Sequence, residues 1–237
     1  MIVRSAEQNE ASRIRQAYAR RDYLVPKGRY SLFNEANRLR YLELLREVLA
    51  LLRRFDYTEL GEKSILDVGC GNGAWLRRFI EWGARPADLF GVDLLEESIR
   101  SAKELSPPGM TLLCDDASQL KFNEETFDIV AQFAVFTSIL NSEVRSRLAS
   151  EMSRVLKPGG AILWYDFFVS NPRNPDVRRV TREEISRLFP GLRIFLKRIT
   201  LAPPIGRAIG SAAPPLYHLL SSLKPLCTHY LGFFSKP

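Results

Sequence analysis

The chain has 237 residues, of which 46% are hydrophobic and 26% are charged, so it is not mostly disordered and has room for one large domain with additions. Lysine and arginine (34 residues) exceed aspartate and glutamate (27 residues), which gives a net charge of +7. This excess permits an anionic partner. Basic residues are less concentrated than in most nucleic-acid-binding domains, however, so nucleic acid is not the expected partner.

The cysteines and the apolar runs indicate in which compartment the protein is expected. Cys70, Cys114 and Cys227 show no paired spacing for a metal, and we expect reduced thiols in a cytoplasmic protein that needs no metal. The opening residues, MIVRSAEQNE, lack the apolar run of a secretion signal, and no uncharged apolar stretch of about 18 residues occurs. The sequence therefore predicts no membrane span, although peripheral contact with a membrane is compatible with it.

Residues 1–60 are predicted to form a helical cap. Residues 5–21 carry a charge-rich helical pattern, and a second helical pattern at residues 35–55 follows Asn34, which suits an N-cap. The second helix has leucines at spacings of three and four, which predict one apolar face. These leucines are Leu39, Leu42, Leu45, Leu49 and Leu52.

Residues 61–237 are predicted to form the core. SILDVGC, LFGVDL, MTLLCDD, FDIVAQFAVF and AILWYDFFV are predicted strands. AWLRRFIEW, EESIRSAKEL and a segment from about residue 142 to residue 156 are the helices between them. LKPGG, residues 156–160, is predicted to end the last of these helices and to turn into the fifth strand. Such alternation builds a parallel sheet through right-handed crossovers.

The C-terminal part departs from this alternation. Thr181 and Glu184 predict a capping box for a short helix. RIFLKRITL and THYLGFF are two further predicted strands, and we expect a hairpin with a long insertion at residues 202–227. Long insertions in compact domains are more often functional than decorative.

The stretch ILDVGCGNGAWL fits two nucleotide-binding spacings. One is the dinucleotide fingerprint G-x-G-x-x-G/A, through Gly69, Gly71 and Ala74. The other is D-x-G-x-G-x-G, through Asp67 and three glycines that end at Gly73. The glycines lie between a predicted strand and a predicted helix, so backbone N–H groups and the helix N-terminus can face a ligand. The motif alone leaves both cofactors open.

Nearby acids favour one of the two cofactors. Asp93, at the end of the second strand, suits the acid that binds ribose hydroxyls, but both cofactors have a ribose. Asp67 would repel a diphosphate and attract the ammonium group of an amino-acid-bearing cofactor, which favours a sulfonium cofactor. Asp115 and Asp116 close the third strand and offer acceptors for an adenine amino group.

With ILDVGCGNG, GVDL, CDDASQL, FDIV and RVLKPGG in this order, residues 63–169 resemble the class I S-adenosylmethionine-dependent methyltransferases. Within that class, the chain resembles the bacterial type 11-like enzymes that act on small molecules. The resemblance implies an α/β fold with a Rossmann-like, seven-stranded, mostly parallel sheet, an antiparallel C-terminal hairpin and helices on both faces. It places the N-terminal helical cap and the insertion over the cofactor, where the acceptor pocket is expected.

The resemblance also implies S-adenosylmethionine as the cofactor and a set of residues that bind it. The glycine loop is expected beneath the cofactor, with acids at its methionine part, ribose and adenine, and two residues after the fourth strand on the methionyl side. These residues are Asp67, Gly69, Gly71, Gly73, Asp93, Leu94, Asp115, Asp116, Ala117, Gln132 and Phe133. From the cap, Tyr18, Tyr30 and Arg38 are candidates to close over the cofactor or the acceptor.

Three residues are candidates for a general base, which is needed only if the acceptor arrives protonated. His218 and His229 are the only histidines, and Asp166 ends the fifth strand at the edge of the sheet where ligands bind. Each of these residues has an alternative without a catalytic role: a histidine packed in the structure, or an aspartate that caps a loop. Arg173 and Arg178 are candidates to clamp an anionic acceptor, with a proline-stiffened surface loop as the alternative.

The function that follows is methyl transfer by in-line displacement to a small-molecule acceptor, anionic or hydrophobic. O-methylation of a sugar, a lipid-linked intermediate or a secondary metabolite is expected. An RNA methyltransferase is one alternative, although AQFAVFTS after the fourth strand lacks the two prolines typical of enzymes that methylate base amino groups. A NAD-dependent oxidoreductase and a non-catalytic cofactor-binding protein are alternatives of other classes.

Overall fold

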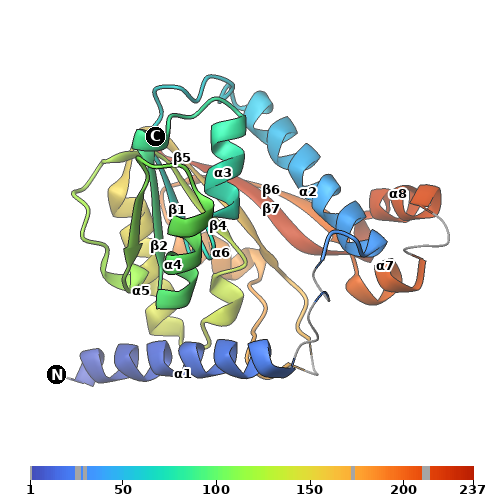
Figure 1. Cartoon of the computed structure of the whole chain (residues 1–237), viewed down its shortest axis with the longest axis horizontal. Coiled ribbons are helices and arrows are strands. Elements are labelled where there is room, and N and C mark those ends of the chain that lie inside the picture. The colour runs from blue at the N-terminus through green and yellow to red at the C-terminus, as the bar shows by residue number, and fades with distance from the viewer. Residues whose placement is uncertain (1, 25–27, 29–30, 172–173, 210–213) are drawn as a thin grey trace.

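The computed structural model describes residues 2–24, 28, 31–171, 174–209 and 214–237. Its centre is a seven-stranded sheet in the order β3-β2-β1-β4-β5-β7-β6, with helices on both faces (Figure 1). Neighbours from β3 to β5 pair in parallel, and β7 pairs antiparallel with both β5 and β6. The predicted fold class is therefore confirmed. The strands are β1 (Ile65–Val68), β2 (Leu89–Asp93), β3 (Thr111–Cys114), β4 (Phe127–Phe133), β5 (Leu156–Phe167), β6 (Arg193–Leu201) and β7 (Cys227–Ser235).

Eight α-helices surround the sheet in the described part of the chain. They are α1 (Ile2–Leu24), α2 (Glu35–Arg54), α3 (Ala74–Glu81), α4 (Glu96–Leu105), α5 (Ser142–Val155), α6 (Arg182–Leu188), α7 (Pro203–Ile209) and α8 (Pro214–Ser222). Short 3-10 segments lie at Pro86–Asp88, Ala117–Gln119, Phe136–Ser138 and Lys224–Leu226. No helix among these residues is long and apolar enough to cross a membrane.

The two N-terminal helices lie in different places. α1 runs across the carboxyl ends of the parallel strands, whereas α2 lies beside β6 and β7 (Figure 1). Asn34 caps α2, because its side chain accepts a hydrogen bond from the N–H of Asn37 at 3.3 Å. The apolar face of α2 differs from the predicted one. Leu39 and Leu52 are buried as predicted, but Leu42 and Leu49 are exposed. The helix buries Leu44, Val48 and Leu51 in their place.

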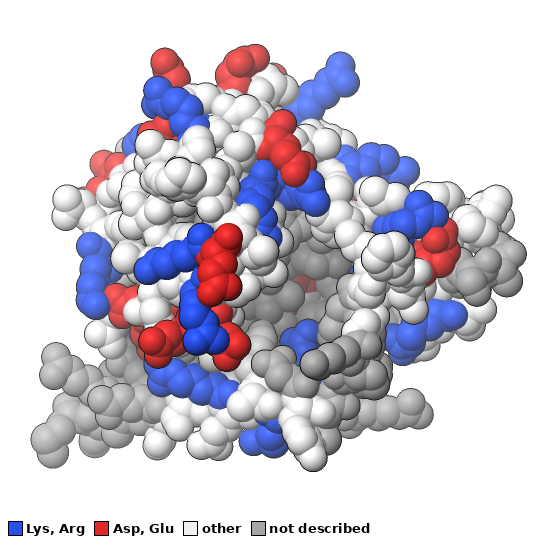
Figure 2. Space-filling model, in the orientation of Figure 1, with Lys and Arg blue, Asp and Glu red and all other residues white. Residues whose placement is uncertain are grey.

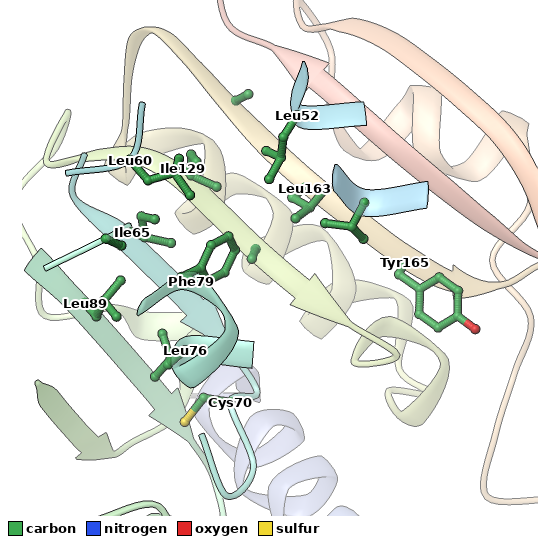
Figure 3. Packing of buried hydrophobic residues seen from close by; sticks show 14 of the residues in the cluster. Leu52, Leu60, Ile65, Cys70, Leu76, Phe79, Leu89, Ile129, Leu163 and Tyr165 are labelled. Carbon is green, nitrogen blue, oxygen red and sulfur yellow. The ribbon is translucent and has the colours of Figure 1, made fainter. Parts of the chain in front are cut away.

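Two apolar layers enclose the sheet, one on each face. Figure 3 shows the layer in which Leu52 of α2 and Phe79 of α3 meet side chains of β1, β4 and β5. In that view the ring of Tyr165 turns its hydroxyl away from the aliphatic side chains, and the hydroxyl bonds to Oγ1 of Thr200 at 2.9 Å. The opposite layer packs α5 and α6 against the other face, around the fully buried Trp164.

The expected turn at residues 156–160 is instead the first part of β5. Leu156 pairs with Phe127 and Ala161 pairs with Ile129, so the residues between them bulge out of the ladder. Gly159 has a φ of 75°, which suits this bulge. The preceding helix ends at Val155, as its pattern indicates.

Candidate functional site

The glycine loop joins β1 to α3 and leaves open space for a ligand. Gly69 and Gly71 have positive φ angles of 69° and 53°, which residues with a side chain rarely adopt. A Cβ atom at Gly69 would lie 2.4 Å from Cγ2 of Val135, so this position has no room for a side chain. A Cβ atom at Gly71 would meet no atom within 4 Å, and Gly71 lines a cavity. The loop thus presents bare backbone to this cavity.

Asp93 ends β2 and holds the glycine loop in place. Its carboxylate accepts hydrogen bonds from the backbone N–H groups of Gly71 and Leu95, both at 2.9 Å. Burial raises the pKa of this carboxyl despite these bonds. Asp93 also lines the cavity, and each carboxylate oxygen has a second lone pair. The side chain is therefore placed to accept further hydrogen bonds from a ligand.

Asp67 lies beneath the loop and not in the cavity lining. Its side chain is buried, and its Oδ1 atom has no hydrogen-bond partner in the described part of the chain. Burial, and secondarily the charge of Asp93, raises the pKa of Asp67 well above its usual value. An unpartnered buried carboxyl of this kind favours a positive charge nearby.

The cavity has a volume of about 190 Å³ and lies at the carboxyl ends of β1 to β4. In open α/β sheets, ligands bind at this edge. Most of the expected cofactor-binding residues line the cavity. They are Gly69, Gly71, Asp93, Leu94, Asp115, Asp116, Ala117 and Phe133. Asp67, Gly73 and Gln132 do not line it, and Tyr30 lies outside the described residues.

One end of the cavity is formed by the turn after β3. Asp115 is paired with Lys121, with 2.6 Å between carboxylate oxygen and ammonium nitrogen. Asp116 caps the short 3-10 segment that follows, because its Oδ1 accepts a hydrogen bond from the N–H of Ser118 at 2.9 Å. The Oγ atom of Ser118 is buried and has no partner among the described residues. Ser118 was not among the residues expected from the sequence, and its hydroxyl adds a free polar atom at this end.

The turn after β4 forms the opposite part of the lining. Gln132 is fully buried and positions this turn, because its amide bonds to the carbonyl of Tyr165 (3.3 Å) and to the N–H of Val135 (3.0 Å). Phe133 lines the cavity, and its ring stacks on Trp75 of α3 at a centroid distance of 3.8 Å. Ala134 has a φ of 63°, a strained value for a residue with a side chain, and such strain concentrates at functional sites.

Helix α1 closes the cavity, and apart from Tyr18 its lining residues were not among the site residues expected from the sequence. Glu10 accepts hydrogen bonds from the N–H groups of Leu140 (2.6 Å) and Asn141 (3.4 Å), and it also pairs with Arg13 at 2.9 Å. The hydroxyl of Tyr18 bonds to the Ser138 hydroxyl at 3.2 Å. The α1 residues in the lining are Glu10, Ala11, Ile14 and Tyr18.

Neither histidine expected as a base lines the cavity. His218 is exposed on α8. His229 is buried in β7, with its ring stacked on Tyr165 and packed against Phe167 at centroid distances of 4.8 and 4.1 Å. Burial lowers the pKa of His229 to about 3, so its ring is neutral near pH 7. The sequence placed His229 correctly within a strand, where it is a packed side chain.

Asp166 is also buried and does not line the cavity. Its two oxygens accept hydrogen bonds from the N–H groups of Thr137 (3.2 Å) and Phe167 (2.9 Å), so it anchors the segment after β4. Burial raises the pKa of Asp166 to about 6. Of the expected arginine clamp, Arg178 pairs with Glu184 at 2.9 Å, and Arg173 lies outside the described residues.

Comparison with known proteins identifies the domain. Residues 65–160 match a family model described as a methyltransferase domain. A phthiotriol/phenolphthiotriol dimycocerosates methyltransferase 1 from Mycobacterium ulcerans is 32% identical, over 50% of this chain and 43% of the relative. A tRNA (carboxymethyluridine(34)-5-O)-methyltransferase from Arabidopsis thaliana is 36% identical, over 42% of this chain and 22% of the relative. A 2-methyl-6-phytyl-1,4-hydroquinone methyltransferase from Synechocystis is 32% identical, over 44% of this chain and 32% of the relative. The match spans less than half the length of these relatives.

The fold is shared with solved structures. An S-adenosylmethionine-dependent methyltransferase from Archaeoglobus fulgidus superimposes with a TM-score of 0.59 and 20% identity, over 88% of this chain and all of the other. The superposition supports the fold class, and the match of residues 65–160 to a methyltransferase domain agrees with the resemblance and with S-adenosylmethionine as the cofactor.

Proposed function

We propose, on the premise that this chain belongs to the class I S-adenosylmethionine-dependent methyltransferases, that it transfers a methyl group to an oxygen atom of a lipid-soluble small molecule. The observation that carries this proposal is the cavity in which Asp93 and the bare glycine loop meet at the carboxyl edge of the sheet. Two curated relatives support the acceptor class, because their names specify dimycocerosates and a phytyl hydroquinone.

The residues present fit this cofactor. Asp93 would accept hydrogen bonds from the ribose hydroxyls, and the space at Gly71 would take the methionine part. Asp67 lies beneath the loop and outside the cavity lining, so its buried, unpartnered carboxyl would act on the ammonium group only across the loop. Ser118 and Ala117 would lie against the adenine. The bound cofactor would supply an electrophilic methyl group on a sulfonium.

The remaining work of the chain is to position the acceptor and exclude water. An in-line displacement needs the attacking oxygen, the methyl carbon and the sulfur on one axis. The turn at Phe133, braced by Gln132 and stacked on Trp75, is rigid enough to define one side of that axis. Helix α1, held by Glu10, would keep bulk water from the reacting atoms.

The proposal assigns no general base. None of His218, His229 and Asp166 lines the cavity, so each would need a route to the acceptor through other groups. A phenol or quinol ionises near pH 10, far more readily than an alcohol, and therefore needs less help to become a nucleophile. An acceptor of this kind would need none of these three residues as a base.

The first test is calorimetric binding of S-adenosylhomocysteine and of NAD to the purified protein. Asp93→Ala should weaken S-adenosylhomocysteine binding by about tenfold or more, because charged hydrogen bonds to the ribose are lost. Asp88→Ala, at the opposite end of β2, is the matched control and should bind normally. Binding of NAD alone would overturn the cofactor assignment, and binding of neither would remove the proposal.

The second test is transfer of labelled methyl groups from S-adenosylmethionine. A total lipid extract should become labelled, whereas bulk tRNA should not. The Arabidopsis relative makes tRNA the second candidate acceptor, so labelling of tRNA alone would replace the lipid-soluble acceptor by a nucleic acid. If neither the lipid extract nor tRNA becomes labelled although the protein binds S-adenosylhomocysteine, the protein binds the cofactor without methylating these acceptors. That result would contradict the proposal.

A further inference from the structure

The C-terminal segment of the chain carries basic residues and no acidic ones. Residues 185–237 contain seven lysine and arginine residues and no aspartate or glutamate, which equals the net charge of the whole chain. Over α3 and α4, by contrast, acidic and basic side chains are interspersed (Figure 2) and form ion pairs such as Arg78–Glu81 and Arg100–Glu97. The basic residues of the segment are Arg187, Arg193, Lys197, Arg198, Arg207, Lys224 and Lys236.

Two of these cations belong to the insertion between β6 and β7 and remain unpaired. Lys197 pairs with Glu47, and Lys236 lies 3.7 Å from Glu125, so acids from elsewhere compensate some of the charge. Arg207 of α7 and Lys224, just after α8, are exposed and form no ion pair within the described ranges. The insertion therefore carries an uncompensated positive charge.

The outer face of α8 is apolar although it is exposed. Leu216 and Leu219 are 40% and 62% exposed, and their spacing of three places them along one side of the helix. Leu223, one residue beyond the end of α8, is 48% exposed. No residue of α8 is charged. Exposed apolar side chains grouped in this way mark a surface that contacts another body, so we expect a partner to cover this leucine face.

The inner face of α8 is fixed to the core, so the leucines cannot turn inward. The Tyr217 hydroxyl donates a hydrogen bond to Glu43 of α2 at 3.1 Å, and the N–H of Thr200 donates to the same carboxylate at 3.3 Å. Tyr217 is 1% exposed and packs with Leu39 and Leu201. Helix α8 is thus anchored to the core beside α2 (Figure 1).

The insertion projects from the edge of the sheet that holds the cavity. Leu201, which ends β6, pairs with Cys227, which begins β7, and Phe167 at the carboxyl end of β5 pairs with His229. The insertion therefore begins and ends next to the carboxyl ends of the parallel strands. A body resting on α8 would face the same edge as the cavity.

We propose that the leucine face of α8, flanked by Arg207 and Lys224, docks on the surface of an anionic lipid bilayer. Leucines that enter the headgroup boundary and lysine or arginine beside them are the two contributions that hold peripheral helices on such membranes. A second copy of this chain is a less suitable partner. In a symmetric dimer through this face, the acid-free segments of both copies would meet and their positive charges would repel each other. Docking would bring the cavity to a membrane-resident acceptor, and this purpose rests on the proposed function.

The test is co-sedimentation of the full chain with vesicles of phosphatidylcholine alone or mixed with phosphatidylglycerol. The chain should bind the mixed vesicles and not the neutral ones, and added salt should weaken the binding. Leu219→Ser and Lys224→Glu should each lower the bound fraction, the charge reversal by about tenfold in affinity. Their matched controls on α4 are Leu105→Ser, an apolar residue 55% exposed, and Lys103→Glu, and neither should change it.

Other outcomes overturn the docking surface. Equal binding to both vesicle types, binding to neither, or an undiminished Leu219→Ser variant would each do so. Light scattering that shows a dimer, dissociated by Leu219→Ser, would assign the face to a second copy. Calorimetry with S-adenosylhomocysteine on the same preparations separates the two proposals. Vesicle binding without cofactor affinity would remove the enzyme assignment alone, and normal cofactor affinity without vesicle binding would remove the docking surface alone.

Discussion

Replacing Gly71 with alanine tests whether the cofactor rests on the glycine loop. The new Cβ would meet no protein atom within 4 Å, so the fold itself has room for it. The position has a φ of 53°, and a left-handed conformation costs a residue with a side chain about 1–2 kcal/mol. For a chain of this size, such a loss lowers the melting temperature by roughly 2–8 °C.

The effect on the cofactor is separate from this backbone cost. The added methyl would occupy cavity space that we assign to the cofactor, and overfilling a packed site costs about 1–3 kcal/mol. That range corresponds to a dissociation constant for S-adenosylhomocysteine that is roughly 5- to 150-fold larger. The loss should appear in calorimetry and not only in thermal unfolding.

Gly191→Ala is the matched control. Gly191 has a φ of 84°, a Cβ there would also meet nothing within 4 Å, and the residue lies between α6 and β6 outside the cavity lining. It should lose similar stability and keep full cofactor affinity. If Gly71→Ala binds S-adenosylhomocysteine as tightly as Gly191→Ala does, the cofactor does not rest on this loop.

Three further perturbations follow from the same contacts. Asp166 is protonated in the folded state between about pH 4 and pH 6 but ionised in the unfolded state, so its ionisation costs the fold up to about 3 kcal/mol as pH rises through 6. Asp166→Asn should thus gain stability relative to the native protein between pH 4 and pH 7 in urea unfolding, and a pH-independent difference would refute this. Glu10→Ala removes a charged acceptor from the N–H of Leu140, so stopped-flow measurements should show S-adenosylhomocysteine leaving roughly tenfold faster, and an unchanged rate would mean that α1 does not close the site. Gly91→Ala puts a Cβ within 2.9 Å of three core side chains and should lose about 1–3 kcal/mol in thermal unfolding, whereas Gly61→Ala, with its only contact at 3.6 Å, should lose less.

Local patterns were enough to predict the half of the site that the sheet provides. The strand, glycine loop and helix are contiguous in sequence, so Gly69 and Gly71 are fixed by their immediate neighbours. Asp93 follows from the rule that strand ends meet at one edge. Glu10 offers no such signal, because its partners at Leu140 and Asn141 lie 130 residues away and are backbone groups of any sequence.

The strand residues expected to act as bases show a different limit. Successive side chains of a strand point to opposite faces, so one residue decides between two environments. Tyr165 belongs to the layer that contains α2 and α3, whereas its neighbour Asp166 bonds to Thr137 on the other side. The pattern WYDFF locates the strand but gives no absolute face, because both faces of a central strand are buried.

The position of β7 has a consequence for how the molecule is made. Although β7 follows β6 along the chain, it lies between β5 and β6 in the sheet. During synthesis, β6 therefore emerges without a neighbour to pair with, and the helices α7 and α8 leave the ribosome before their support is complete. The edge of the sheet and the projection it carries can form only once Cys227–Ser235 has been translated, so this side of the molecule assembles as a single late unit while the glycine loop is already in place.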